Sequence, residues 1–293
     1  MNTILRSTNR TLTIGATEPF VIIGEKINPT GSKKLGKALS NKDFEFIKEL
    51  AIRQSAWGAD VLDVNVGQPG VQETTLIVNV VRTIQSVSDL PLCIDSNDPL
   101  VLEAGLREAE GKPLVNSVNA EDKQLRRILP IVKDRGAAVI GLTIDDNGIP
   151  KTAEERVAAA EKIITRAAAI GIAIEDIIID PLVLTVGADN QAALVTLQTI
   201  SLLRENFGVN INLGASNVSF GLPDRPTINS AFLPMAIQVG ATCSITDPIK
   251  LGCLVHATDL LLGRDNNSIR YLKYFRATEK LRNIETENAQ NPG

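Results

Sequence analysis

The sequence predicts an α/β fold, a (β/α)₈ barrel in which eight parallel strands alternate with eight helices. The first observation behind this prediction is a repeated pattern, in which a short aliphatic run precedes an amphipathic segment that often closes at glycine. The second is the length of 293 residues, because one such barrel occupies about 250 residues. The third is the loop EKINPTGSKKLG, which lacks the GxGxxG pattern of a doubly wound open sheet, the structural alternative.

Eight runs of β-forming residues are predicted as the strands. They cover residues 21–24, 61–66, 91–95, 114–118, 137–144, 176–181, 210–217 and 243–246. The helices that follow them are expected at about 42–57, from about 71, and at 99–108, 121–135, 153–170, 190–206, 229–239 and 248–262. Pro99 suits a first helical turn, and Gly58, Gly136 and Gly171 suit helix ends.

The two ends of the chain lie outside this repeat. Residues 1–20 are an N-terminal extension, predicted as a hairpin that turns around Asn9 and Arg10 and covers the base of the barrel. Residues 264–293 are predicted to begin with a short helix over SIRYLKYFRATEKL and to end in a polar, frayed tail. Since no linker divides the chain, residues 1–293 are expected to form a single domain.

The composition excludes several classes of protein. The net charge is −4 and basic blocks are absent, so nucleic acid is not expected as a partner. No apolar run reaches the roughly 20 residues that span a bilayer, and the first residues lack a signal-peptide core, so we expect a cytoplasmic location. Cys93, Cys243 and Cys253 are predicted to be reduced. His256 is assigned to one face of a helix, and no bound metal is expected.

Polar residues appear at almost every predicted strand end, where barrel enzymes build their active sites. These residues are Glu25, Asn28, Asp63, Asn65, Asp95, Ser96, Asn97, Asn116, Asn119, Thr143, Asp145, Asp180, Asn217 and Asp247. Some residues at these ends are expected only to cap helices, namely Asn97, Asp98, Asp145 and Asp247.

Asp63, Asp95, Asn116 and Asp180 each follow a run of apolar β-forming residues, so they are expected to face the barrel mouth. Burying a carboxylate there costs several kcal/mol unless it has a partner. The polar residues at the strand ends are mainly acids and amides, and they include no histidine, no lysine suited to a Schiff base and no serine elbow. Such groups suit the hydrogen-bonding edge of a nitrogen-rich heterocycle, and this chemistry leaves a pterin and a guanine-like ring equally open.

Seven strings carry a resemblance to a known family. They are IGEKIN, LDVNVG, CIDS, VNSVNAE, GLTIDDNGIP, IIDPL and GASNVSFGLPDRP. In order and spacing they resemble the pterin-binding, corrinoid-dependent methyltransferases, a family with a dihydropteroate-synthase-like barrel that includes the folate domain of cobalamin-dependent methionine synthase. The likeness runs from about residue 20 to residue 263.

The resemblance implies roles for individual residues. Asp95, Asn116 and Asp180 match the residues that hold the pterin ring, and Asn217 matches the asparagine that hydrogen-bonds the N5 nitrogen during transfer. Four further positions match residues that line the same mouth: Glu25, Asn28, Asp63 and Asn65.

The resemblance also implies an activity, the transfer of a methyl group between the cobalt of a corrinoid and N5 of tetrahydrofolate. The sequence lacks a DxHxxG corrinoid-binding motif, so the corrinoid is expected on a partner protein. A homodimer is expected, as is usual in the family. The sequence does not set the direction of transfer.

Two alternatives have different chemistry. Dihydropteroate synthase shares the barrel and the pterin ring, but it carries a serine–arginine/lysine motif after strand seven, where this chain has GASNVSF. A non-catalytic folate-binding subunit would need no donor at N5, so Asn217 argues against it.

Overall fold

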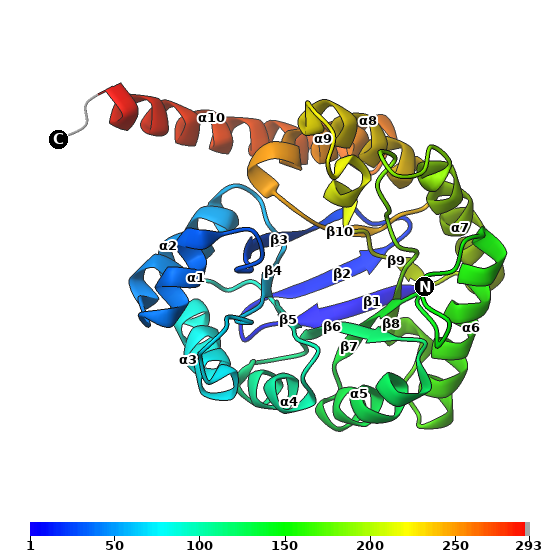
Figure 1. The fold of residues 1–293 in the computed structure, drawn as a ribbon. Coiled ribbons are helices and arrows are strands. Elements are labelled where there is room, and N and C mark those ends of the chain that lie inside the picture. Colours follow the sequence, from blue (N-terminus) through cyan, green and yellow to red (C-terminus); the bar gives the residue numbers. More distant parts are fainter. Residues whose placement is uncertain (291–293) are drawn as a thin grey trace.

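In the computed structural model, which describes the backbone of residues 1–290 and the side chains of residues 1–283, eight parallel strands surround a central axis (Figure 1). They are β3 (Val21–Ile27), β4 (Val61–Val64), β5 (Leu92–Asp95), β6 (Leu114–Asn119), β7 (Ala138–Leu142), β8 (Ile177–Asp180), β9 (Asn210–Ile211) and β10 (Cys243–Thr246). The order in the sheet is β10-β3-β4-β5-β6-β7-β8-β9. Backbone bonds from Thr242 to Ile211 (3.0 Å) and from Ile245 to Leu213 (2.9 Å) join its two edges. The predicted barrel is confirmed.

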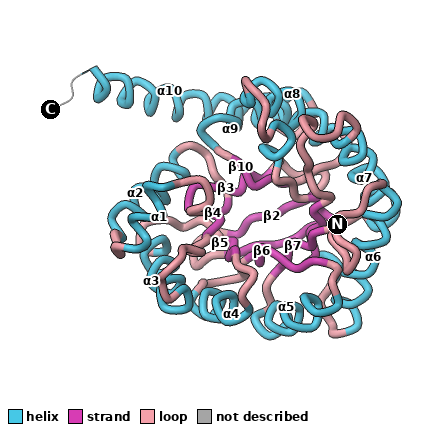
Figure 2. The backbone as a smooth tube through the Cα atoms, viewed as in Figure 1, coloured by secondary structure: helices cyan, strands magenta, loops and turns pink. Residues whose placement is uncertain are grey.

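Helices form the outer ring, which Figure 2 separates from the strands by colour. They are α1 (Lys33–Ser40), α2 (Phe44–Ala56), α3 (Glu73–Gln85), α4 (Pro99–Glu108), α5 (Asp122–Arg135), α6 (Ala153–Ala169), α7 (Ala192–Phe207), α8 (Arg225–Gln238) and α9 (Pro248–Leu261). Short 3₁₀ turns occupy Ile174–Asp176, Ala215–Ser219 and Asn266–Ser268.

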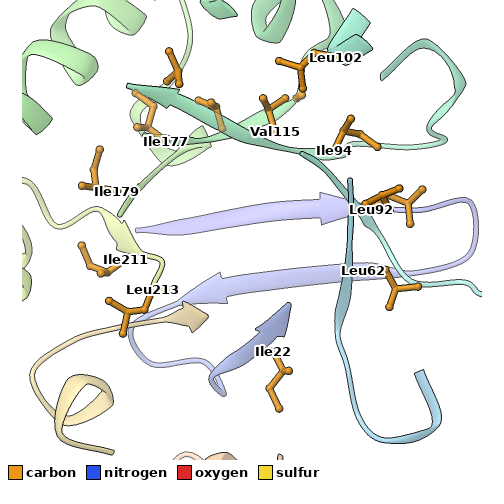
Figure 3. Close-up of a cluster of buried hydrophobic side chains, with 14 of the residues drawn as sticks. Ile22, Leu62, Leu92, Ile94, Leu102, Val115, Ile177, Ile179, Ile211 and Leu213 are labelled. Carbon is orange, nitrogen blue, oxygen red and sulfur yellow. The ribbon is translucent and has the colours of Figure 1, made fainter. Parts of the chain in front are cut away.

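Side chains alternate along each strand between the barrel interior and the helices. Ile22, Leu62, Ile94, Val115 and Ile179 belong to the larger core, between strands and helices, and Figure 3 shows them arranged around the barrel. The strand residues that point the other way form a separate buried cluster inside the barrel: Val21, Ile23, Val61, Cys93, Leu114, Ala138, Ile140, Ile178 and Cys243. This two-residue register decides which side chains at the strand ends face inward.

The predicted N-terminal hairpin is confirmed. β1 (Asn2–Arg6) and β2 (Thr11–Gly15) pair antiparallel and lie across the centre of the barrel in Figure 1. Leu5 and Ile14 are fully buried within the interior cluster. The Asn210 amide donates to Thr3 Oγ1 and to the Ile14 carbonyl, both at 2.9 Å. Since Asn210 begins β9, the hairpin closes the end of the barrel where the strands start.

Several of the predicted elements differ from those observed. The first loop contains α1, a helix that the sequence analysis missed because its glycines and lysines are typical of a loop; Ser32 caps it, and Leu35 and Leu39 bury one face. The first strand continues to Ile27, so Glu25 lies within it. The seventh strand ends at Ile211 rather than at residue 217, and α8 begins at Arg225 rather than near residue 229.

The helix predicted after the barrel is α10 (Ile269–Gln290), which projects away from the barrel in Figure 1. Its Tyr274 is buried, and its ring packs against His256, with the ring centroids 4.2 Å apart. The helix was expected to end near residue 281, so the expectation of a frayed tail is wrong up to Gln290, and residues 291–293 lie outside the described residues. Within the described part of the chain, no helix is both long and apolar enough to cross a membrane.

Candidate active site

The inward-facing positions of four strands become polar as the strands end. Val61 is followed two residues later by Asp63, Cys93 by Asp95, Leu114 by Asn116, and Ile178 by Asp180. Because the period of a strand is two, each polar residue faces the same side as the buried residue before it. This pattern directs four of the predicted residues into the mouth of the barrel.

Five of the predicted residues form two adjacent hydrogen-bonded sets. The Asn116 amide donates to Asp63 at 3.2 Å. Asp95 Oδ2 accepts from the amides of Asn28 at 3.2 Å and of Asn65 at 3.0 Å. Asp95 also lies beside Asn116, because these two residues pair in register across β5 and β6. The amides therefore hold both carboxyl groups in fixed orientations.

Burial changes the protonation of this group. It raises the pKa of Asp63, and the negative charge of Asp95 raises it further. The pKa of Asp95 is also raised by burial, although the hydrogen bond from Asn65 opposes the change. Two adjacent buried carboxyl groups resist joint ionisation. We therefore assign a proton to Asp63, which lets this residue donate as well as accept a hydrogen bond.

Asp180 forms a second group on the β8 side of the mouth. It accepts from the Leu182 backbone N–H at 2.9 Å and from the Asn212 amide at 2.8 Å. Burial raises the pKa of Asp180 to about 6, although these bonds and the backbone N–H of Gly214 favour its carboxylate. Asp180 is thus largely ionised at neutral pH and keeps lone pairs for a ligand.

Arg156 stabilises the backbone directly after Asp180. Its side chain is buried, and its guanidinium donates to the carbonyls of Pro181 (2.8 Å) and Leu182 (2.9 Å), directly after Asp180. These bonds fix the backbone that positions the Asp180 carboxylate.

Asn217 lies in the 3₁₀ turn Ala215–Ser219, which replaces the predicted end of strand seven. Gly214 connects it to the Asp180 group, since the Gly214 N–H bonds Asp180 and the Gly214 carbonyl accepts from the Asn217 N–H at 3.1 Å. A Cβ atom at Gly214 would come within 2.9 Å of the Asn217 amide nitrogen. A short turn without a side chain at residue 214 therefore leaves room for this amide.

Two cavities open at the mouth. The larger, of about 660 Å³, is lined by Glu25, Asn28 and Asn217 together with residues of α1, α2, α8 and α9. The smaller, of about 330 Å³, is lined by Asn65, Asp95 and the start of α4. The bond between Asn28 and Asp95 links residues of the two cavities. All eight predicted site residues thus belong to one of these hydrogen-bonded groups or to the larger cavity, and Asp63, Asn116 and Asp180 line neither cavity.

Sequence reasoning missed two residues at this site. Asn212 follows Asn210 at the two-residue spacing and faces inward, a signal that could have revealed it. Lys26 lines the larger cavity, 2.8 Å from Asp247 and 3.2 Å from Glu25. Burial alone would lower the pKa of Lys26, but these two carboxylates outweigh it and the pKa is raised. Lys26 is therefore an ammonium ion and not a nucleophile.

The predicted caps are confirmed in two cases and wrong in two. Asp98 caps α4 and Asp247 caps α9. Asp145 instead accepts from the Asn147 N–H within a tight turn, because Thr152 caps α6. Asn97 is not a cap, because the next residue, Asp98, takes that role; Asn97 lines the smaller cavity.

His256 lies on α9, as predicted. Burial lowers its pKa to about 4, so the ring is neutral at physiological pH. Among the side chains that the structure describes, no group of three or more His, Cys, Asp and Glu could hold a metal ion.

Comparison with known proteins identifies the family of this chain. A family model described as "Pterin binding enzyme" matches residues 24–247. A methylcorrinoid:tetrahydrofolate methyltransferase from Eubacterium limosum is 33% identical over 262 residues, which cover 88% of this chain and 96% of the relative. Methionine synthase from Mycobacterium tuberculosis is 32% identical over 247 residues, which cover 79% of this chain but only 20% of that protein.

Solved structures share the fold. Dihydropteroate synthase from Vibrio fischeri superposes with a TM-score of 0.69 at 18% identity, over 89% of this chain and 99% of that one. The Xanthomonas albilineans enzyme gives 0.66 at 21% identity, over 91% and 100%. From the matched family model and the similar enzymes, we conclude that this chain is a methyltransferase of the pterin binding enzyme family.

Proposed function

We propose that the protein transfers a methyl group between N5 of tetrahydrofolate and the cobalt of a corrinoid that a partner protein carries. The observation that carries the proposal is the placement of Asn217, a neutral amide donor, in one cavity with Asn28, whose amide bonds Asp95 in the adjoining group of acids and amides. The similarity to a methylcorrinoid:tetrahydrofolate methyltransferase supports it.

In this proposal the pterin ring lies on the groups of Asp95, Asn116 and Asp180. An ionised carboxylate accepts two parallel hydrogen bonds from a ring N–H and an adjacent amine. Asp180 and Asp95 supply such acceptors, and Asn116 supplies a group that both donates and accepts. Glu25, Asn28, Asp63 and Asn65 support these residues or line the mouth. Fixing the ring sets the position of N5, and positioning is a large term in catalysis.

Asn217 acts on the reacting nitrogen. When the methyl group leaves N5 for cob(I)alamin, the C–N bond breaks and its electron pair stays on the nitrogen, while the cobalt provides both electrons of the new bond. A hydrogen bond from the Asn217 amide stabilises the negative charge that develops on N5 by about 2–4 kcal/mol. The nitrogen then takes up a proton. In the reverse direction the same contacts hold the N5 lone pair in line with methylcobalt.

An anaerobic absorbance assay tests the proposal. The protein is mixed with cob(I)alamin and 5-methyltetrahydrofolate, or with methylcobalamin and tetrahydrofolate, and the cobalt spectrum is followed. We expect turnover in at least one direction. Absence of transfer in both would refute the proposal, and release of diphosphate from a pterin diphosphate would establish the dihydropteroate synthase alternative.

Replacing Asn217 with alanine separates catalysis from binding. We expect Asn217→Ala to change the tetrahydrofolate Kd by no more than a few-fold and to lower methyl transfer by about 100-fold, because the donor acts mainly in the transition state. Asn190→Ala, an exposed asparagine before α7, serves as the matched control and should retain full activity. An equal loss of affinity and turnover in Asn217→Ala would reduce Asn217 to a binding residue.

The expectations of a cytoplasmic location and a homodimer remain part of this proposal. The three cysteines are free thiols, which suits a reducing compartment. Leu261, Ile269 and Leu272 expose 86%, 62% and 43% of their surface on α9 and α10, which gives a second subunit an apolar face to pack against.

A further inference from the structure

The larger cavity carries an excess of positive charge that the transfer step does not use. Its charged lining consists of four cations and two anions: Lys26, Lys34, Arg225, Lys250, Glu25 and Asp247. The balance is +2, whereas the whole chain carries −4. A positive cavity in an acidic protein favours an anionic ligand.

The contacts of these side chains show which of the cations lie near a carboxylate and which do not. Lys26 lies between Glu25 and Asp247, and Lys250 Nζ is 4.0 Å from Asp247. The described contacts of the other two cations are with neutral groups. Lys34 Nζ lies 4.4 Å from the centre of the Phe46 ring, and Arg225 donates to Ser219 Oγ and to the Ser216 carbonyl. Two positive charges therefore remain for a ligand.

The cavity also has an apolar wall and a suitable volume. Phe46, Leu50, Pro226, Ile245 and Leu251 line it beside the cations. Its volume of about 660 Å³ lies within the range of sites that bury a whole small molecule. Asn28 and Asn217 stand at the same cavity, so a ligand whose ring reaches these residues can extend its remaining part toward the cations.

We infer that this cavity holds the p-aminobenzoyl-glutamate tail of the folate, and that it selects polyglutamylated forms. The inference rests on the proposed function. The benzoyl ring packs against Phe46 and Leu251, and Lys34 and Arg225 face the two carboxylates of a monoglutamate. Lys250, whose side chain is 68% exposed, faces the carboxylates that further γ-linked glutamates add.

Anaerobic titration calorimetry tests this at low salt with three ligands: tetrahydrofolate, its triglutamate, and a tetrahydropterin with a methyl group in place of the tail. We expect removal of the tail to weaken binding about tenfold or more, and the triglutamate to bind about threefold to tenfold more tightly than the monoglutamate. Raising the salt concentration should reduce both differences, because exposed charges are screened.

The double variant Lys34→Gln, Lys250→Gln should lose most of the preference for the triglutamate while binding the tail-free pterin as the native protein does. Lys37→Gln is the matched control, since it removes a charge from the exposed side of α1 outside the cavity. Both replaced lysines are exposed, and equal thermal unfolding temperatures would show that the variants fold.

Each outcome decides a different point. Equal affinity for the tail-free pterin and both folates, with methyl transfer intact, overturns the tail site and leaves the proposed function standing. An unchanged triglutamate preference in the double variant overturns the assignment to these lysines. If inorganic diphosphate displaces the folates at lower concentration than p-aminobenzoyl-glutamate does, the cavity serves a diphosphate and the inference fails. Failure of all three ligands to bind refutes the proposed function itself.

Discussion

At the end of β8, one carboxyl group combines burial with three hydrogen-bond donors. Asp180 is 6% exposed, and it accepts bonds from Leu182, Asn212 and Gly214. The donors favour the carboxylate, but burial opposes them more strongly, and the pKa rises to about 6. Asp180 therefore changes protonation just below neutral pH. The affinity for a ligand that donates hydrogen bonds to this carboxylate depends on that change.

This shift predicts a pH-dependent affinity. Below pH 6 the free protein holds a proton on Asp180 that a donating pterin edge must displace, so tetrahydrofolate affinity should fall by up to about tenfold per pH unit. Above pH 7 the contribution of Asp180 should be level, and a further change toward pH 8 would belong to Asp63, whose pKa is raised to about 8 by burial and by the charge of Asp95. Asp180→Asn should weaken binding at neutral pH by about 1–3 kcal/mol, since an amide can turn a donor toward a donor, and should flatten the profile. Calorimetry between pH 5 and pH 8 measures both effects.

Asp145→Asn provides the control, because Asp145 follows the neighbouring strand but bonds only within its own turn in the described contacts. Its profile should match that of the native protein. A profile in Asp180→Asn that still falls below pH 6 would assign the titration to another group.

Among the elements, the hairpin of β1 and β2 has the clearest structural role. It fills the end of the barrel opposite the site, and Leu5 and Ile14 complete the interior cluster with the first residues of the strands. The interior is then packed from the hairpin up to the polar layer of Asp63, Asp95 and Asn116. A firmly packed interior is what holds those buried side chains in one geometry.

Leu5→Ala should therefore lower the free energy of unfolding by about 2–5 kcal/mol, the range for a buried leucine whose cavity does not collapse. Urea unfolding monitored by circular dichroism measures the change. Leu194→Ala is the control, because Leu194 on α7 is 57% exposed, and it should change stability by less than about 0.5 kcal/mol. If Leu5→Ala also lowered the free energy of unfolding by less than about 0.5 kcal/mol, the hairpin would not contribute to the barrel core.

At the scale of the whole molecule, Asp259 ties the beginning of the barrel to its end. It is 1% exposed, accepts from the Phe20 backbone N–H at 2.9 Å, and pairs with Arg264 (3.5 Å) and Arg270 (3.3 Å). Phe20 precedes the first barrel strand, whereas the two arginines lie after α9. One carboxylate thus joins the chain just before the first barrel strand to the segment that follows α9.

Asp259→Asn should cost about 3–5 kcal/mol of stability, because it removes the buried carboxylate that pairs with Arg264 and Arg270, whose side chains are only 14% and 35% exposed. Asp122→Asn offers a matched comparison, since Asp122 also pairs with two cations, Lys162 and Arg166, but is 39% exposed. The loss there should stay below about 1 kcal/mol. Equal losses in thermal or urea unfolding would contradict the role of burial.

Much of the site follows from the period of the strands. The runs before Asp63, Asp95, Asn116 and Asp180 are apolar and β-forming, and the period of two directs these polar residues inward once the strands pair. For Asn212 the same signal was present but was overlooked. Asn217 was identified through a resemblance alone, because it lies outside the regular strand, in a turn whose geometry has no simple sequence signature.

The sequence by itself determined the eight strand and helix pairs, the hairpin, and the polar residues of the mouth, because these depend on local propensity and on a fixed side-chain period. Only the tertiary structure decided that α1 forms within the first loop, that Lys26 lies between Glu25 and Asp247, and that surplus cations gather on one side of the mouth. Those features arise where α1, α2, α8 and α9 meet, and contacts between distant segments leave no local pattern in the chain.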